Sequence, residues 1–250
     1  MDVLVAPAKL TVSLRVTGVR ADGYHLIDAE MVTLDLCDEL EVSAGDGLEV
    51  LLEGPAGASS GLAVPEGDDN LVRRALSLVG RRAHVRLRKR IPAGAGLGGG
   101  SADAAAILRW AGVDDPAIAS RLGADVPFCV AGGRARVTGA GERLERLAPR
   151  RQVFTLVIPP LGCSTPAVYQ AWDHLGGPRQ EGNDLEPAAL EVAPGLAAYR
   201  DALAARTGRR PVLAGSGSTW FVEGAHPGPG HLVARTRDDR PLGRPSGAVG

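Results

Sequence analysis

Eleven residues near the middle of the chain constrain its fold more than any other stretch. From Ile91 to Ser101 they read Ile-Pro-Ala-Gly-Ala-Gly-Leu-Gly-Gly-Gly-Ser, and an alanine-rich helical segment follows. Glycines let backbone N–H groups converge where side chains would collide, and the N-terminus of a helix attracts anions. Residues 84–91 alternate in polarity as a β-strand does. We therefore expect a strand, an anion-binding loop and a helix in succession.

Backbone amides of this loop are predicted to bind phosphate groups. Ser101 is placed as the N-cap of the following helix, although its hydroxyl could instead face a phosphate or Mg²⁺. A glycine turn with a purely structural role is the alternative. The loop residues concerned are Pro92, Ala93, Gly94, Ala95, Gly96, Leu97, Gly98, Gly99, Gly100 and Ser101.

Two better-known phosphate loops do not fit this stretch. The glycines match a dinucleotide-binding fingerprint, but that fold places the fingerprint directly after its first strand and an acidic residue about 20 positions on, at a strand end. Here the loop lies in mid-chain, Pro92 interrupts its approach, and Asp114 and Asp115 fall in a predicted turn. No Gly-Lys-Ser/Thr follows the glycines, so a Walker A loop is excluded as well.

Charge and cysteine content narrow the possible partners. The formal net charge is −1, which gives no long-range attraction to nucleic acid or to an anionic membrane. Three widely spaced cysteines show neither metal-ligand spacing nor a disulfide framework. Neither a signal peptide nor an apolar run of membrane-spanning length is visible. We expect a soluble, cytoplasmic protein, monomer or homodimer, that binds no nucleic acid and no membrane.

Lys9 and Asp125 are the candidate catalytic residues. Lys9 is one of only two lysines among 28 basic residues, and it begins an alternating strand to Val16 whose polar face includes Thr11. Asp125, in Gly-Ala-Asp-Val-Pro, could accept the proton of a hydroxyl that attacks phosphorus, and Lys9 could hold that carboxylate ionised. The alternatives are a solvated sheet face for the strand and a capping or turn role for Asp125.

Three further short motifs are candidates for substrate binding. Tyr24 and His25 follow a glycine turn and offer an aromatic plate beside a hydrogen-bonding ring, and Tyr169 could face them from the second half of the chain. Gly215 and Ser216 lie in a second loop of small residues. A buried tyrosine and a core histidine are the commoner meanings of such residues.

Periodicity predicts an α+β protein in two parts. Residues 70–79 have helical spacing with Asp69 or Asn70 as N-cap, and residues 128–131 are predicted as a strand. The first domain is assigned to residues 1–150 and a shorter second one to residues 151–224. Residues 225–250 are rich in Pro, Gly and Arg, and we expect this tail to be poorly ordered.

Four motifs in this order resemble the GHMP small-molecule kinases. They are Ala-Pro-Ala-Lys-Leu-Thr-Val-Ser-Leu from Ala6 with Arg-Ala-Asp-Gly-Tyr-His from Arg20, the glycine loop, Leu-Gly-Ala-Asp-Val-Pro-Phe from Leu122, and Leu-Ala-Gly-Ser-Gly-Ser from Leu213. The motifs at Arg20 and Leu122 resemble those of the branch that phosphorylates a cytidine-diphosphate-linked methylerythritol.

The resemblance implies a fold and a set of roles. The fold would be a ribosomal S5 domain 2-like half and a ferredoxin-like half, with the active site in the cleft between them. ATP, with Mg²⁺, would donate its γ-phosphate to the 2-hydroxyl of the substrate in isoprenoid biosynthesis. Asp125 would be the base with Lys9 as its partner, the glycine loop would hold the triphosphate, and Tyr24, His25 and Tyr169 would enclose cytosine.

Two departures from the family pattern leave alternatives open. Thr11 stands where this branch typically has Asn, so it can donate one hydrogen bond and not two. The second half is also short. A GHMP kinase for another small alcohol, or a degenerate nucleotide-binding homologue without activity, are the competing interpretations.

Overall fold

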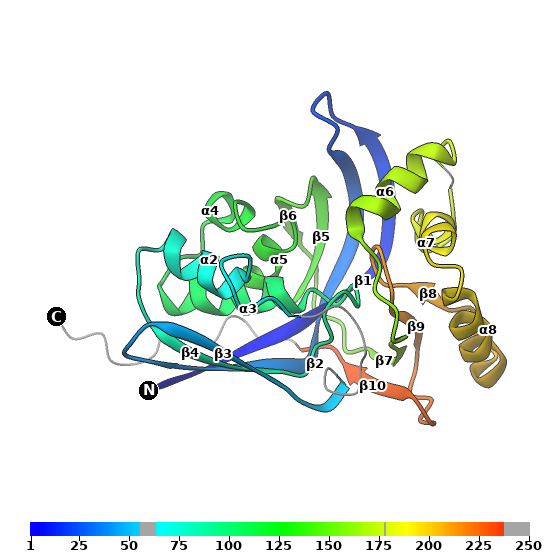
Figure 1. Cartoon of the computed structure of the whole chain (residues 1–250). Coiled ribbons are helices and arrows are strands. Elements are labelled where there is room, and N and C mark those ends of the chain that lie inside the picture. The colour runs from blue at the N-terminus through cyan, green and yellow to red at the C-terminus, as the bar shows by residue number, and fades with distance from the viewer. Residues whose placement is uncertain (56–63, 178, 238–250) are drawn as a thin grey trace.

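Two β-sheets with helices packed on them make up the protein (Figure 1), of which the computed structural model describes residues 1–55, 64–177 and 179–237. The larger sheet has the order β3-β4-β2-β5-β6, with β1 also paired to β2, and among its described strand pairs β3–β4 is parallel and the others are antiparallel. The smaller sheet is antiparallel, with the order β10-β7-β9-β8. The strands are β1 (Asp2–Val19), β2 (His25–Ser43), β3 (Gly47–Leu52), β4 (His84–Lys89), β5 (Arg134–Gly139), β6 (Arg143–Arg146), β7 (Val153–Val157), β8 (Val212–Leu213), β9 (Trp220–Glu223) and β10 (His231–Arg235).

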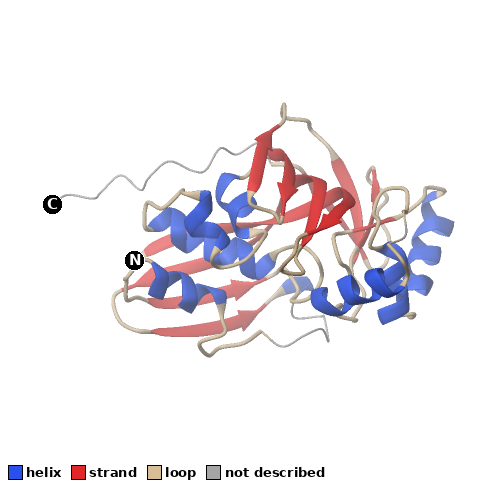
Figure 2. Ribbon diagram, turned by 90° about the horizontal axis from the view of Figure 1, so that it is seen from above, coloured by secondary structure: helices blue, strands red, loops and turns tan. Residues whose placement is uncertain are grey.

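Helices α2 to α5 cover one face of the larger sheet, whereas α6 to α8 accompany the smaller one (Figure 2). Their bounds are α2 (Leu71–Leu78), α3 (Gly99–Trp110), α4 (Pro116–Ser120), α5 (Val126–Ala131), α6 (Thr165–His174), α7 (Glu186–Val192) and α8 (Leu196–Thr207). The predicted cap of α2 is confirmed, because the Asn70 side chain accepts a hydrogen bond from the Val72 N–H. Among the described helices, none combines the length and apolar character that crossing a membrane requires.

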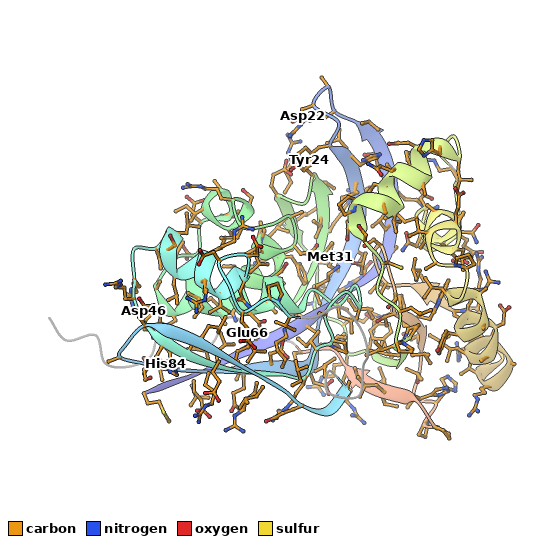
Figure 3. All side chains as sticks on the ribbon, viewed as in Figure 1. Asp22, Tyr24, Met31, Asp46, Glu66 and His84 are labelled. Atoms are coloured by element: carbon orange, nitrogen blue, oxygen red, sulfur yellow. The ribbon has the colours of Figure 1, made fainter. Side chains whose placement is uncertain are left out.

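A long hairpin of β1 and β2 connects the two halves. The strands pair from Asp2 opposite Val42 to Val19 opposite His25, with register shifts that bend the ribbon. The hairpin tip projects beside α6 (Figure 1), and Figure 3 shows Asp22 and Tyr24 at this end. The hairpin therefore brings His25, the first residue of β2, into contact with α6 from the second half of the chain.

A second, smaller core joins the sheets to each other. It contains Leu10 and Leu34 from the hairpin together with Phe154 and Phe221 from the smaller sheet. The two phenylalanine rings meet edge to face at 5.6 Å between centroids. The same cluster includes apolar residues of both small-residue loops, namely Ala95, Leu97 and Ala214. These loops are therefore anchored in the core, although they reach the surface of a cavity.

Two predictions of local structure are wrong. Residues 128–131 belong to helix α5 and not to a strand, because Pro127 at the first turn starts a helix whose buried residues are consecutive. Residues 225–237 are ordered: β10 pairs with β7 along five residues, and Ala234 is 1% exposed in the second core. A five-residue strand between proline and glycine turns is too short for its period to stand out. The rest of the predicted tail lies outside the described residues.

Candidate active site

One cavity of about 890 Å³ collects the predicted site residues from both halves of the chain. Its walls come from the hairpin, the glycine loop, the start of α5, helix α6 and the loop after β8. The predicted residues that line it are Lys9, Thr11, Tyr24, His25, Pro92 to Ser101, Asp125, Tyr169, Gly215 and Ser216. Each of them thus lies where a ligand in this cavity would meet it.

The glycine loop leads directly into α3, but the helix begins earlier than predicted. Gly98 is the N-cap, in a left-handed conformation with φ 68°, and Gly99 and Gly100 form the first helical positions. Ser101 is therefore in the first turn and is not the N-cap, because the glycines continue into the helix. The first-turn amides have no intrahelical acceptor, and Gly99, Gly100 and Ser101 all line the cavity. This geometry provides N–H donors and a helix dipole for an anion.

The two small-residue loops pack backbone against backbone. A Cβ on Gly96 would lie 2.4 Å from the Ala214 carbonyl oxygen and 2.7 Å from that of Gly217. The Thr219 N–H donates to the Ala95 oxygen at 3.1 Å. Part of the glycine requirement is therefore structural, because the close approach of the two loops leaves no room for a Cβ at Gly96.

Lys9 and Asp125 meet directly under these loops. Lys9 Nζ lies 3.2 Å from Asp125 Oδ2 and donates to Thr11 Oγ1 at 3.0 Å. Lys9 is buried, with 6% of its side chain exposed, whereas 32% of the Asp125 side chain is exposed. Although Asp125 occupies the N-cap position of α5, its carboxylate makes no capping hydrogen bond within the described part of the chain. The carboxylate is instead held by the ammonium and open to the cavity. A Cβ on Gly98 would lie 2.7 Å from Lys9 Cγ, so the glycine loop packs directly against the Lys9 side chain.

The aromatic end of the cavity forms between β2 and α6. The His25 and Tyr169 rings are 4.6 Å apart with a tilt of 34°, and the Trp172 edge approaches His25 at 5.7 Å. Burial, with a smaller contribution from the Asp125 charge, raises the pKa of Tyr169, so its phenol stays neutral. Tyr24 is 61% exposed, and the Arg20 guanidinium lies 5.3 Å from its ring centroid. Tyr24 therefore lies at the solvent-exposed rim of the cavity, at the same end as the His25–Tyr169 pair.

The second loop forms the cavity wall between the Lys9–Asp125 pair and α6. Ser216 Oγ and Thr165 Oγ1 share a hydrogen bond of 2.8 Å, which ties the loop to the start of α6. Gly215 has φ 60°, and a Cβ there would lie 3.4 Å from Lys9 Nζ. The absence of a side chain at Gly215 keeps the ammonium side of the cavity open.

Sequence reasoning missed a buried ionic cluster below the glycine loop. Lys89 Nζ donates to Asp38 and, at 2.8 Å, to Asp103 Oδ2, and all three side chains are at most 4% exposed. A Cβ on Gly99 would lie 2.9 Å from Lys89 Nζ, which places the cluster under the first turn of α3. Burial raises the pKa of Asp103 to about 7, against the opposing effect of Lys89. The available signals were Lys89 as the only other lysine and a lone aspartate in an alanine-rich helix.

A second missed element is the segment Asn183-Asp184, which fastens the second half to β1. Asn183 Nδ2 donates to the carbonyl oxygens of Leu213 and Gly215, at 2.8 and 2.6 Å. Asp184 is fully buried and accepts hydrogen bonds from Arg15 and from the Val16 N–H. From sequence alone, a Gly-Asn-Asp run is indistinguishable from an ordinary turn.

Comparison with known proteins agrees with this site. Residues 70–133 match the family model described as GHMP kinases N terminal domain. The 4-diphosphocytidyl-2-C-methyl-D-erythritol kinase of Paracoccus denitrificans is 40% identical over 236 residues, covering 86% of this chain and 84% of that protein. The kinase of the same name from Granulibacter bethesdensis is 38% identical, covering 90% and 86%.

Solved structures show the same relationship. A crystal structure of 4-(cytidine 5'-diphospho)-2C-methyl-D-erythritol kinase superposes with a TM-score of 0.68 at 35% identity, covering 88% of this chain and 89% of that one. Homoserine kinase from Cytophaga hutchinsonii, at 15% identity and a TM-score of 0.56, shares the fold. With the expected α+β architecture also present, the chain belongs to the GHMP kinase family, among the relatives named 4-diphosphocytidyl-2-C-methyl-D-erythritol kinase.

Proposed function

We propose that this protein transfers the γ-phosphate of ATP to the 2-hydroxyl of 4-diphosphocytidyl-2-C-methyl-D-erythritol, a step of non-mevalonate isoprenoid biosynthesis. The observation that carries the proposal is the contact of Lys9 with Asp125, 3.2 Å apart, beside the glycine loop. Relatives of that name along most of the chain support the choice of substrate.

Asp125 is the proposed general base. Its carboxylate takes the proton of the substrate hydroxyl as that oxygen forms a bond to the γ-phosphorus, while the bond from that phosphorus to the oxygen bridging it to ADP breaks. Lys9, whose ammonium lies 3.2 Å from the carboxylate and donates to Thr11, attracts the negative charge that develops on the reacting oxygens. A compact ammonium suits this position because the Gly98 backbone packs directly on the lysine stem.

ATP use follows from membership of the family, and the loop fits a triphosphate. The first-turn residues of α3 line the cavity, so the phosphates of a nucleotide bound there would lie at the positive end of the helix. Mg²⁺ usually binds through phosphate oxygens and one or two carboxylates. The described residues hold no cluster of three His, Cys, Asp or Glu side chains, so we expect Mg²⁺ to enter with ATP, near Ser101 and Asp125.

The cytidine half of the substrate is assigned to the aromatic end of the cavity. Tyr169 offers a ring face on one side, and exposed Tyr24 can close from the other. His25 presents a ring nitrogen at the same end, and the sugar alcohol would lie between this end and Asp125, along Thr11, Gly215 and Ser216. A non-catalytic role is disfavoured because the two groups needed for transfer are in contact.

A coupled assay of ADP release tests the proposal. The purified protein, with ATP and Mg²⁺, is offered the cytidyl substrate and, separately, mevalonate and homoserine. We expect kcat/KM for the cytidyl substrate to exceed the other two by at least about 100-fold, since sites that hydrogen-bond a substrate group discriminate strongly against molecules lacking it. Preference for another alcohol would reject the substrate, and no turnover with any of them would reject a kinase function.

A further inference from the structure

Asp173 has no role in the chemistry above, yet it lies on the wall of the same cavity. It is the ninth residue of α6 and reaches across to the first residue of β2, with its Oδ1 at 2.9 Å from His25 Nε2. The side chain of His25 is 10% exposed and that of Asp173 is 49% exposed. The two residues are 148 positions apart in the chain, so this contact belongs to the way the halves assemble.

Helix α6 holds the imidazole on three sides. Tyr169 packs against the imidazole ring at a tilt, Trp172 makes an edge-type contact with it, and Asp173 forms a hydrogen bond with Nε2. Among the described residues, His25 Nδ1 makes no hydrogen bond. The ring is therefore fixed in orientation with one nitrogen committed to a partner and the other left for a ligand of the cavity that His25 lines.

The partner of Nε2 decides the chemical character of Nδ1. An ionised carboxylate only accepts hydrogen bonds, so the nitrogen that faces Asp173 carries the hydrogen. In a neutral imidazole the other nitrogen then has a lone pair and is an acceptor. Cytosine presents an amino donor at the position where uracil presents a carbonyl acceptor. An acceptor at Nδ1 suits the first base and repels the second.

We propose that Asp173 is a positioning residue that fixes the tautomer of His25 and thereby makes the site select cytidine-containing over uridine-containing substrates. The inference rests on the proposed function, because it assumes that the aromatic end of the cavity takes the pyrimidine. Asp173 would then contribute to substrate specificity through its contact with His25, without touching the reacting atoms.

Asp173→Asn tests this device with little change of shape. An amide can turn its NH₂ toward Nε2, which allows the opposite tautomer with a hydrogen on Nδ1. We expect KM for the cytidyl substrate to rise about tenfold, the loss of about one hydrogen bond, with kcat within about twofold and KM for ATP unchanged. The kcat/KM preference for the cytidyl over the matching uridyl substrate should fall about tenfold. Asp201→Asn, an exposed helical aspartate on α8 paired with Arg200, is the control and should change none of these values.

A spectroscopic measurement separates this inference from the proposed function. Long-range ¹H–¹⁵N correlation spectra of the histidine rings, with His25 assigned from the His25→Gln variant, should show a bare Nδ1 in the wild type and a mixture of tautomers in Asp173→Asn. A protonated Nδ1 in the wild type, or an unchanged base preference in Asp173→Asn, would overturn the role of Asp173 even if the wild type is an active kinase. Inactivity of the wild type toward the cytidyl substrate would instead reject the proposed function, whatever the tautomer.

Discussion

At the scale of single residues, the site is defined by which charged side chains are buried and what compensates them. Lys9 is buried against one carboxylate, Asp125, that remains partly exposed and therefore accessible to a ligand in the cavity. Lys89 is buried against two carboxylates, Asp38 and Asp103, and Asp103 Oδ1 has no hydrogen-bond partner among the residues that the structure describes. The Lys9–Asp125 pair is therefore accessible to a ligand, whereas the buried cluster around Lys89 packs beneath the first turn of α3 and supports the glycine loop.

The raised pKa of Asp103 makes stability depend on pH. Because its folded pKa, about 7, exceeds the unfolded value of 3.8, the folded state binds more protons between these values. This contribution to stability is complete below pH 3.8 and is lost as pH rises toward 7, at no more than about 1.4 kcal/mol per pH unit. Asp103→Asn removes this titration. The free energy of unfolding of the variant, minus that of the wild type, should therefore increase as the pH is raised from 5 to 7.5.

Urea unfolding at several pH values measures this difference. Asp201→Asn, at an exposed site, controls for the loss of a carboxylate as such. A difference between Asp103→Asn and wild type that stays constant from pH 5 to pH 7.5 would show that Asp103 does not titrate in this range.

Residue types predicted which residues line the cavity better than they predicted which residues lie beneath it. Lys9, Asp125 and the glycine loop stand out in the sequence because phosphoryl transfer calls for an ammonium, a carboxylate and exposed backbone amides. Asp38 and Asp103 do not stand out, because an aspartate paired in the core and one on the surface have the same sequence signature. Only the pairing in space, with Lys89, distinguishes them.

At the scale of elements, the site depends on loops that pack against each other without side chains. Gly96 combines a φ of 76° with a Cβ direction that is blocked by two carbonyl oxygens. Sequence patterns predicted both loops and the helix after the first one. They placed the start of α3 at Ser101 and made residues 128–131 a strand, because a run of glycines and a short apolar run carry no helical period.

Gly96→Ala should separate these loops. We expect it to lower the free energy of unfolding by about 1–3 kcal/mol, the usual cost of overpacking, and to raise KM for ATP because the phosphate-binding face moves. Gly80→Ala is the matched control: Gly80 also has a positive φ, 63°, but a Cβ there has no atom of the described residues within 4 Å. If both variants lose equal stability and keep the same KM for ATP, backbone strain alone would account for Gly96.

At the scale of the whole molecule, the two halves share a core, and the cavity lies where they meet. Leu10 and Leu34 of the hairpin pack with Phe154 and Phe221 of the smaller sheet. The alternating strand, the α+β class and the family motifs were readable in the sequence because they are local. Strand β10 and the Asn183-Asp184 segment were not, since their roles depend on partners far along the chain.

Strand β10 should contribute measurably to global stability. A chain ending at Glu223 lacks this partner of β7 and the buried Ala234, and we expect its melting temperature to lie at least about 5 °C below that of a chain ending at Arg237. Both chains lack residues 238–250, so the comparison isolates residues 224–237. Equal melting temperatures would mean that β10 is not part of the cooperative fold.

The phosphoryl-transfer rate of Asp125→Asn tests whether the Asp125 carboxylate is the base in the reaction. The amide keeps the shape of the side chain but cannot take the hydroxyl proton, so kcat should fall by about 10²- to 10⁴-fold. The dissociation constant for ATP, measured by calorimetry, should stay within about threefold, because the loop amides of α3 are unchanged. A variant that retains kcat within tenfold of wild type would contradict the assignment of Asp125 as the base that works beside Lys9.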